Sequence, residues 1–441
     1  MLSSKLIPTW SLLVFMMFLI VACEKDDPGE PLQVAPVITD ITPYSGQIGD
    51  HVSIFGQNFG PSGVAGSDTS VSYVTVDFNG VSATVDRIRQ REDYQQAIIP
   101  GEQSISTIVP QGATSGKITV TSSMNSTSAV SPADFLVTTP NFEPNVSVED
   151  ALYVGDYGLF GIFGIDVDVN GNYYIVGWTS TDGPVPVRSH IFKLSPSGVD
   201  TIVSNLFRPS WASSDFHYGL TVDKANNVYA PIGHTICKIS PDGQIDTIAG
   251  SGVPGFVDGP AVSAQFLAPW DLDIDDGGNI YVTGFENHAI RKIATDGTVT
   301  TLAGGSSGYT DGWGSMAQFF GPLDIAIGPQ NNIYLTELGN SVIRKITAEG
   351  LVSTFAGGKA GYFDSNREEA HFSNLRGLVI DDAENIYVVD SGNKTIRKIS
   401  MSGQVTTVAE VNARWGLAVD EQGNLHYYDE DSKTIRKIVF N

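Results

Sequence analysis

The sequence predicts an all-β protein in which an immunoglobulin-like sandwich is followed by a six-bladed β-propeller. Three observations support this prediction. A tetrapeptide of the form Ile-Arg-Lys-Ile occurs in four identical and two degenerate copies in the C-terminal two-thirds of the 441-residue chain. Short segments that alternate apolar and polar residues, typical of strands, follow one another from residue 35 onward. The 47 glycines fit a protein with many tight turns.

The first 22 residues are predicted to be a secretory signal peptide. Lys5 supplies a positive charge ahead of an apolar run from Trp10 to Val21. That run ends in Ile20-Val21-Ala22-Cys23, which resembles a bacterial lipobox and implies lipidation of Cys23. The alternative is a transmembrane helix, but the run is shorter than the about 20 residues that a membrane span needs.

Residues 23–34 are expected to form a tether between the lipid and the folded domains. Glu24-Lys25-Asp26-Asp27 resembles the export signal of Bacteroidetes surface lipoproteins. This resemblance implies an outer-membrane lipoprotein that faces the cell exterior.

Residues 35–138 are predicted to form a separate immunoglobulin-like domain. Short alternating strands with regular turns favour a sandwich of two sheets. The motifs are Pro36-Val37-Ile38-Thr39-Asp40-Ile41-Thr42-Pro43, Gly49-Asp50-His51-Val52-Ser53-Ile54-Phe55-Gly56 and Gly116-Lys117-Ile118-Thr119-Val120-Thr121. They resemble the IPT/TIG family, whose domains usually serve as stalks or spacers. A patternless stretch from Thr138 to Pro144 is expected to link this domain to the next.

Residues 145–441 are predicted to form the propeller. The lysines of the six tetrapeptides, which recur every 39 to 54 residues, are 193, 238, 292, 345, 398 and 437. Each period contains four short strand patterns separated by turn residues, which is the content of one propeller blade. The alternation of Ile with Arg and Lys is expected to leave the charged side chains on one face of each blade.

One repeat shows the family resemblance clearly. Asn385-Ile386-Tyr387-Val388-Val389-Asp390 precedes Ile396-Arg397-Lys398-Ile399, and a connecting stretch reads Gly255-Phe256-Val257-Asp258-Gly259-Pro260. These motifs resemble the NHL-repeat family, which implies a six-bladed propeller. The sixth repeat ends after its third strand pattern, and a strand-like segment over residues 145–154 precedes the first repeat. We expect this segment to complete blade six and so remove an open sheet edge.

Composition and motifs reduce the number of function classes that fit the sequence. The formal net charge of −24 disfavours nucleic acid as a partner, because binding it requires neutralisation of phosphates by Lys and Arg. An acidic surface fits solubility outside the cell, or uncharged or cationic ligands. The sequence contains no zincin, serine-hydrolase, Walker or paired-cysteine motif. If Cys23 is lipidated, Cys237 has no disulfide partner, and we interpret it as a small strand residue.

Candidate ligand-binding residues come from positions at which the repeats differ. Side chains at the start of each innermost strand should surround one mouth of the central channel, and aromatic planes there suit sugar rings or apolar peptide groups. The predicted ligand-binding residues are Trp270, Trp415, Tyr218, Arg376, Phe163, Trp178 and Phe285. The alternative interpretation is ordinary propeller packing.

Two sets of acidic residues recur at equivalent positions. Glu337, Asp390 and Asp429 are weak candidates for holding Ca²⁺ or another hard cation, although turn chemistry explains them better. Asp258, Asp311 and Asp364 are interpreted as structural, because a residue needed in several blades points to packing. No cofactor is otherwise expected.

The function predicted from these features is non-enzymatic binding at the cell surface. The layout resembles surface glycan-binding lipoproteins, which implies a glycan as ligand and a membrane contact through Cys23. One alternative is a hydrolase or lyase with a metal site at the channel mouth. Another is an adhesion module that binds a second protein.

Overall fold

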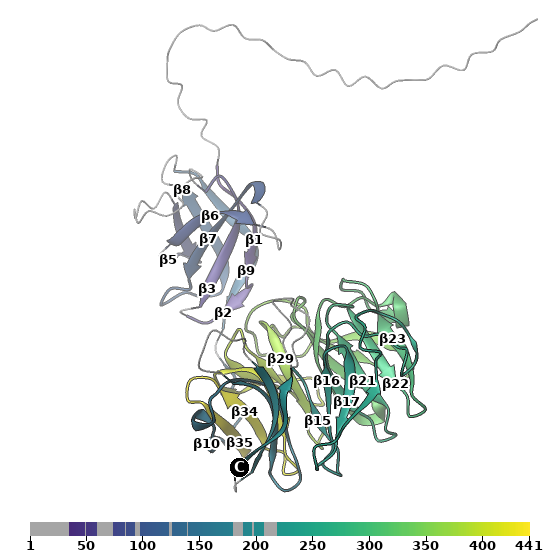
Figure 1. The fold of residues 1–441 in the computed structure, drawn as a ribbon. Coiled ribbons are helices and arrows are strands. Elements are labelled where there is room, and N and C mark those ends of the chain that lie inside the picture. The colour runs from purple at the N-terminus through teal and green to yellow at the C-terminus, as the bar shows by residue number, and fades with distance from the viewer. Residues whose placement is uncertain are drawn as a thin grey trace, which may run out of the picture.

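A computed structural model shows two folded bodies, the sandwich and the propeller, joined by a short connector (Figure 1). It describes residues 35–48, 50–59, 74–83, 85–92, 98–122, 126–138, 140–179, 188–195, 198–206 and 218–441. Cys23 and the predicted signal peptide lie outside these residues. In the described ranges the secondary structure consists of strands and three short 3-10 turns, and no helix there is long and apolar enough to cross a membrane. The predicted all-β class is therefore confirmed.

The N-terminal body is a sandwich of two sheets. The first sheet has the order β1-β3-β7-β6, and the second has the order β2-β9-β8-β4-β5. The strands are β1 (Val37–Thr42), β2 (Ser45–Gly46), β3 (His51–Gln57), β4 (Val74–Phe78), β5 (Val81–Ala83), β6 (Val85–Glu92), β7 (Ile98–Ile108), β8 (Gly116–Ser122) and β9 (Ser128–Val137). Alternate residues of each strand face the core: Val52 and Ile54 of β3 are fully buried, and Phe78 packs edge-on against Phe135.

The C-terminal body is a propeller of six blades, each an antiparallel sheet with four main strands. The first five blades, from the innermost strand outward, are β11–β14, β15–β18, β20–β23, β25–β28 and β29–β32. The innermost strands are β11 (Leu159–Val167), β15 (Thr221–Val222), β20 (Pro269–Ile274), β25 (Pro322–Ile327), β29 (Leu375–Ile380) and, in blade six, β33 (Ala413–Val419).

The other blade strands follow in chain order. The second strands are β12 (Tyr173–Thr179), β16 (Val228–Ile232), β21 (Ile280–Gly284), β26 (Ile333–Glu337), β30 (Ile386–Asp390) and β34 (Leu425–Asp429). The third strands, which carry the tetrapeptide, are β13 (Arg188–Ser195), β17 (Thr235–Ile239), β22 (Ala289–Ile293), β27 (Val342–Ile346), β31 (Thr395–Ile399) and β35 (Thr434–Phe440). The outer strands of blades one to five are β14 (Gly198–Leu206), β18 (Ile245–Ala249), β23 (Thr298–Gly304), β28 (Leu351–Gly357) and β32 (Val405–Glu410), and β19 (Gly259–Pro260) and β24 (Gly312–Trp313) extend blades three and four.

Blade six takes its outer strand from the start of the propeller sequence. Strand β10 (Val146–Tyr153) pairs antiparallel with β35, from Val146 opposite Phe440 to Tyr153 opposite Thr434. The pairing is interrupted by one bulge between Asp150 and Leu152. The expectation that residues 145–154 complete blade six is confirmed, and β35 is left without an open edge.

The arginines of the tetrapeptides contradict one expectation. Arg291, Arg344 and Arg397 are buried, with at most 2% of each side chain exposed, instead of lying on a charged outer face. Each forms an ion pair with the aspartate of the preceding inter-blade loop, namely Asp258, Asp311 and Asp364 respectively. The lysine that follows each arginine does remain partly exposed. The loops cover the arginines, and the sequence alternation does not reveal this covering.

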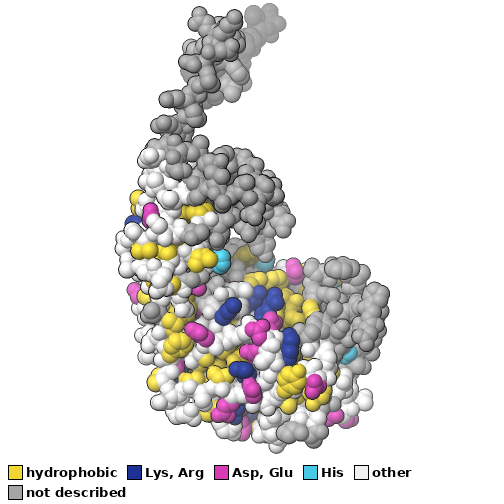
Figure 2. All heavy atoms as spheres, turned by 90° about the vertical axis from the view of Figure 1, so that its left-hand side faces the viewer, with side chains coloured by type: hydrophobic (Ala, Val, Ile, Leu, Met, Phe, Trp, Pro, Cys, Tyr) yellow, Lys and Arg dark blue, Asp and Glu magenta, His cyan; other side chains and the backbone are white. Residues whose placement is uncertain are grey.

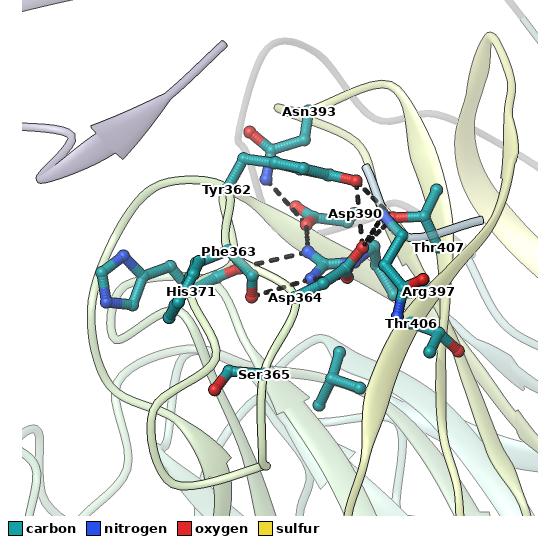
Figure 3. A network of polar contacts seen from close by, with 12 residues as sticks. Tyr362, Phe363, Asp364, Ser365, His371, Asp390, Asn393, Arg397, Thr406 and Thr407 are labelled. Atoms are coloured by element: carbon teal, nitrogen blue, oxygen red, sulfur yellow. Dashed lines mark hydrogen bonds and ion pairs between the residues drawn. The ribbon is translucent and has the colours of Figure 1, made fainter. Parts of the chain in front are cut away.

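Arg397 makes more side-chain hydrogen bonds than Arg291 or Arg344 does (Figure 3). Its guanidinium donates to Asp364 and, at 2.8 Å, to Asp390, as well as to the backbone carbonyls of Phe363 and His371. The rings of Tyr362 and Phe372 lie 4.7 and 5.0 Å from it. A buried charge is tolerated only when it is paired and hydrogen-bonded, and this site meets both conditions.

The connector is more ordered than the sequence indicates. Glu143 donates its backbone N–H to Thr407 of β32, and Thr407 in turn donates to the carbonyl of Asn141. The Glu143 carboxylate accepts from Thr406 and pairs with Lys398 at 3.3 Å. Residues 141–143 therefore lie along the outer edge of blade five.

The sandwich also contacts blade five directly. The hydroxyl of Ser45 lies 2.6 Å from Nδ1 of His371 in a buried contact, and the N–H of Tyr44 donates to the carbonyl of Ala360. The segment that carries His371 leads into β29 at Leu375. The sandwich is therefore seated at the end of blade five where its innermost strand begins.

Candidate functional site

The predicted ligand-binding side chains are directed by a repeated distortion of the innermost strands. In five blades the pairing register of the innermost strand shifts near its start: between Ile162 and Gly164, Pro269 and Leu272, Pro322 and Ile325, Leu375 and Leu378, and Ala413 and Leu417. A bulge leaves a residue unpaired and redirects its side chain. The residues in these bulges include Phe163, Trp270, Arg376 and Trp415, and blade four has Leu323 instead of an aromatic.

A glycine follows the redirected residue in blades one, five and six, because the neighbouring blade approaches there. A Cβ atom on Gly377 would lie 2.6 Å from the carbonyl oxygen of Trp415, and one on Gly416 would lie 2.9 Å from that of Phe163. The glycines thus allow adjacent innermost strands to pack closely around the channel.

The seven predicted side chains form one continuous group, which we call the mouth cluster. Tyr218 and Trp270 stack with their ring centroids 3.7 Å apart and their planes 5° from parallel. Phe163 contacts Trp178 at 4.4 Å and Tyr218 at 5.3 Å, and Phe285 lies 4.8 Å from Trp270. All seven side chains, which are Phe163, Trp178, Tyr218, Trp270, Phe285, Arg376 and Trp415, are half-buried.

Trp415 occupies the centre of the mouth cluster. Its ring lies 5.4 Å from Phe163, 5.3 Å from Tyr218 and 6.4 Å from Trp270. The guanidinium of Arg376 lies over the same ring at 4.2 Å. The side chains therefore meet across the mouth instead of standing apart around an open ring, and they form a continuous aromatic layer.

A cavity of about 220 Å³ lies behind the mouth cluster, along the propeller axis. It is lined by all six innermost strands and contains four carboxyl groups, those of Asp166, Asp271, Asp273 and Asp324. Each carboxyl group accepts a backbone N–H from the next blade, at 2.8 to 3.1 Å, and the four donors are Val222, Ile325, Ile327 and Leu378 respectively. These aspartates therefore link innermost strands of neighbouring blades through hydrogen bonds.

Removal from bulk water raises the pKa of every one of these carboxyl groups. The pKa of Asp166 rises to about 7 and that of Asp273 to about 6, in each case mainly through desolvation. Desolvation also raises the pKa of Asp324 to about 8, and raises that of Asp271 well above its usual value, with the charge of Asp324 adding to the shift of Asp271. At neutral pH the cavity therefore holds a proton on at least part of this group.

These shifts predict that the propeller loses stability as the pH rises. A carboxyl group with a pKa raised by folding stabilises the protein fully below its unfolded pKa of about 4, and this contribution is lost as the pH rises through the folded value. We expect Asp324→Asn, which stays neutral and keeps an acceptor for Leu378, to raise the free energy of unfolding at pH 9 by at least about 1 kcal/mol. Calorimetric melting from pH 5 to pH 9 should show a flatter profile for this variant.

The matched control is Asp276→Asn, which changes an exposed aspartate of blade three. It should retain the slope of the parent protein. Hydrogen bonds from asparagine side chains lower the pKa values of four turn aspartates, which therefore titrate below this pH window: Asp168, Asp223, Asp275 and Asp420. A profile for Asp324→Asn that is parallel to that of the parent would contradict the assignment.

The weak metal candidates do not come together. Glu337 and Asp390 are fully buried, and each pairs with the arginine of its own blade, Arg344 or Arg397. Asp429 lies 4.0 Å from Arg436 in blade six. These arginine neighbours favour the structural interpretation of the three residues over the cation interpretation. Within the described ranges, no group of three or more His, Cys, Asp or Glu side chains is placed to hold a metal ion.

Sequence reasoning missed the four channel carboxyl groups. A signal was present, because Asp271 and Asp324 stand where the other repeats have glycine. A Cβ atom on Gly219 would lie only 1.7 Å from Oδ1 of Asp271, so glycine in blade two makes room for the aspartate of blade three. Cys237 is buried and unpaired in β17, as expected for a small strand residue.

Comparison with known proteins identifies the N-terminal body. Residues 36–137 match the family model of the IPT/TIG domain. The chain is 29% identical over 175 residues to Protein SUPPRESSOR OF QUENCHING 1, chloroplastic, from Arabidopsis thaliana, covering 36% of this chain and 17% of that protein. It is 25% identical over 229 residues to Teneurin-3 of Danio rerio, covering 43% of this chain and 8% of that protein. The chain thus spans less than a fifth of the length of these curated relatives.

Solved structures with a similar arrangement include two auxiliary nutrient binding proteins. Those from Bacteroides thetaiotaomicron and Bacteroides ovatus are 15% and 17% identical, each with a TM-score of 0.48 and with coverage of 92% of this chain and 98% of theirs. A streptogramin B lyase is 15% identical, with a TM-score of 0.44 and coverage of 67% of this chain and 98% of the lyase. At this level of identity the likeness concerns the fold, and the ligands or substrates of those proteins are not assigned to this chain.

Proposed function

We propose that this protein is a non-enzymatic surface lipoprotein that binds a saccharide on the mouth cluster. The observation that carries the proposal is the gathering of six aromatic side chains and one arginine at the end of the propeller axis. Half-buried aromatic rings bury area against sugar rings and are held by their packing at little entropic cost. The NHL-repeat resemblance supports the same use of the propeller as a binding scaffold.

The arrangement of polar groups favours binding over catalysis. Each of the four channel carboxyl groups already accepts a backbone N–H from the next blade, and the aromatic layer separates them from a ligand at the mouth. General acid and base groups must reach the reacting atoms within hydrogen-bond distance. The seven side chains of the mouth cluster are aromatic or cationic, and none of them is a carboxyl or an imidazole group.

The anchor is part of the proposal. The resemblance of residues 20–23 to a lipobox supports lipidation of Cys23. We expect Cys23→Ser to leave an uncleaved or soluble protein, because the lipid can no longer be attached. Fractionation of cell membranes measures this, and an unchanged membrane fraction would count against the anchor.

The binding proposal is tested by replacing Trp270 with Ala. Loss of one stacking plane, worth about 1 kcal/mol or more, should weaken binding of a soluble polysaccharide several-fold. Affinity gel electrophoresis with a panel of soluble polysaccharides measures the change as lost retardation, and a thermal melt of the same sample reports whether the fold is intact.

Trp313 offers a matched control. This tryptophan is 52% exposed in β24 at the outer edge of blade four and is absent from the mouth cluster. Trp313→Ala should bind like the parent. If no polysaccharide retards either the parent or the variants, the saccharide proposal fails and protein partners become the next candidates.

A further inference from the structure

Two arginines approach one ring of the mouth cluster, and among the described residues neither has a carboxylate partner. Arg376 and Arg414 both approach the ring of Trp415, with their guanidinium carbons 4.2 and 5.8 Å from its centroid. Among the described residues, neither arginine makes an ion pair, and Nε of Arg376 is buried without a hydrogen-bond partner. By contrast, the tetrapeptide arginines with described side chains all pair with aspartate.

Two arginines at one ring stand out in a chain with so many acidic side chains. Acidic side chains outnumber basic ones by 49 to 25, and on the face shown in Figure 2 the two kinds are interspersed. Desolvation and the charge of Arg414 together lower the pKa of Arg376 to about 10. A half-buried cation beside a second cation destabilises the free protein, and a bound anion would relieve that repulsion.

The carboxyl groups behind the mouth cluster do not provide the missing anion. Asp271 and Asp324 line the same cavity as Arg376, but they accept backbone N–H groups of Ile325 and Leu378 and form no ion pair with Arg376. Desolvation raises the pKa values of both, which favours their neutral forms. The positive charge of the two arginines therefore remains available to a ligand at the mouth.

We infer that the saccharide bound at the mouth cluster is anionic, with a carboxylate or a sulfate group held by Arg376 and Arg414 while its ring lies on the aromatic layer. This inference rests on the proposed saccharide function. The guanidinium fork suits both groups, since each presents two oxygen atoms to parallel N–H donors. The overall acidic charge of the protein disfavours polyanions elsewhere on its surface.

The test uses the full protein in affinity gels with paired polymers. Polygalacturonate and its methyl ester have the same backbone with and without charge, and dextran sulfate and dextran form the second pair. We expect retardation by at least one charged polymer and not by its neutral counterpart. The first pair reports a carboxylate ligand and the second a sulfate ligand.

Variants connect the result to the site. Arg376→Gln and Arg414→Gln should each weaken retardation by about tenfold, and Arg376→Lys should retain part of it. Arg367→Gln removes the same charge from a half-buried arginine that stacks on Phe355, away from the mouth, and should bind like the parent. Thermal melts of each variant report whether its fold is intact.

The outcomes separate the two proposals. Equal retardation by charged and neutral polymers would overturn the anionic inference and leave saccharide binding standing. Retardation by a charged polymer that survives in both glutamine variants would also overturn it. Absence of retardation by every polymer, charged or neutral, would remove the saccharide function itself.

Discussion

Replacing Arg397 with Met is expected to lower the free energy of unfolding of the propeller by about 3–5 kcal/mol. The substitution removes the charge that Asp364 and Asp390 surround, and both of these carboxylates are almost inaccessible to solvent. It also removes the guanidinium donors to the carbonyls of Phe363 and His371, which then keep only the backbone hydrogen bonds that these two residues exchange with each other. A hydrogen bond to a charged group contributes about 1.5–3 kcal/mol. Urea unfolding followed by circular dichroism measures the change.

Blade six provides the matched control at the equivalent repeat position. The side chain of Arg436 is 32% exposed, and its nearest carboxylate, that of Asp150, is 71% exposed. A solvated ion pair contributes about 0–1 kcal/mol, so Arg436→Met should cost far less than Arg397→Met. An equal decrease in the free energy of unfolding of the two variants would show that burial of the arginine does not determine its contribution to stability.

The second large effect is expected from removal of the closing strand. A chain that begins at Asp156 lacks β10 and the buried Val154, and so loses the whole ladder between β10 and β35. At about 0.5–1.5 kcal/mol for each hydrogen bond, together with the lost apolar burial, its melting temperature should fall by roughly 10 °C or more. A chain that begins at Pro140 keeps β10 and should melt like the parent propeller.

A peptide spanning residues 145–154 gives a further check. Added in excess to the chain that begins at Asp156, it should restore part of the lost melting temperature by binding at β35. If the two truncated chains melt at the same temperature, the closing strand does not stabilise the ring.

The architecture could be predicted because each sequence repeat corresponds to one blade. The tetrapeptide marks the third strand of each blade, and the missing fourth strand after Lys437 indicated that residues 145–154 must supply it. The burial of Arg291, Arg344 and Arg397 could not be predicted in the same way. Alternation shows which residues share a face, but loops from positions about 30 residues earlier in the chain decide whether water reaches that face.

The site was predicted in part for the same reason. Differences between repeats identified the residues of the mouth cluster, because a shared position in each blade becomes a shared place around the axis. The central location of Trp415 depends on side-chain packing between blades, which no single repeat encodes. The roles of Asp166 and Asp273 were hidden as well, since their backbone partners belong to the next blade.

The closing strand also has a consequence for the time course of folding. Most contacts within a blade join strands that are neighbours in the sequence, whereas β10 meets β35 across a separation of nearly 300 residues, as the contact between Ser147 and Asn441 illustrates. Such a distant pairing carries a large loop-closure entropy and favours late formation. Until it forms, β35 presents an unpaired edge to other chains. Ring closure is therefore the step at which concentration and crowding would divert this protein from folding to aggregation.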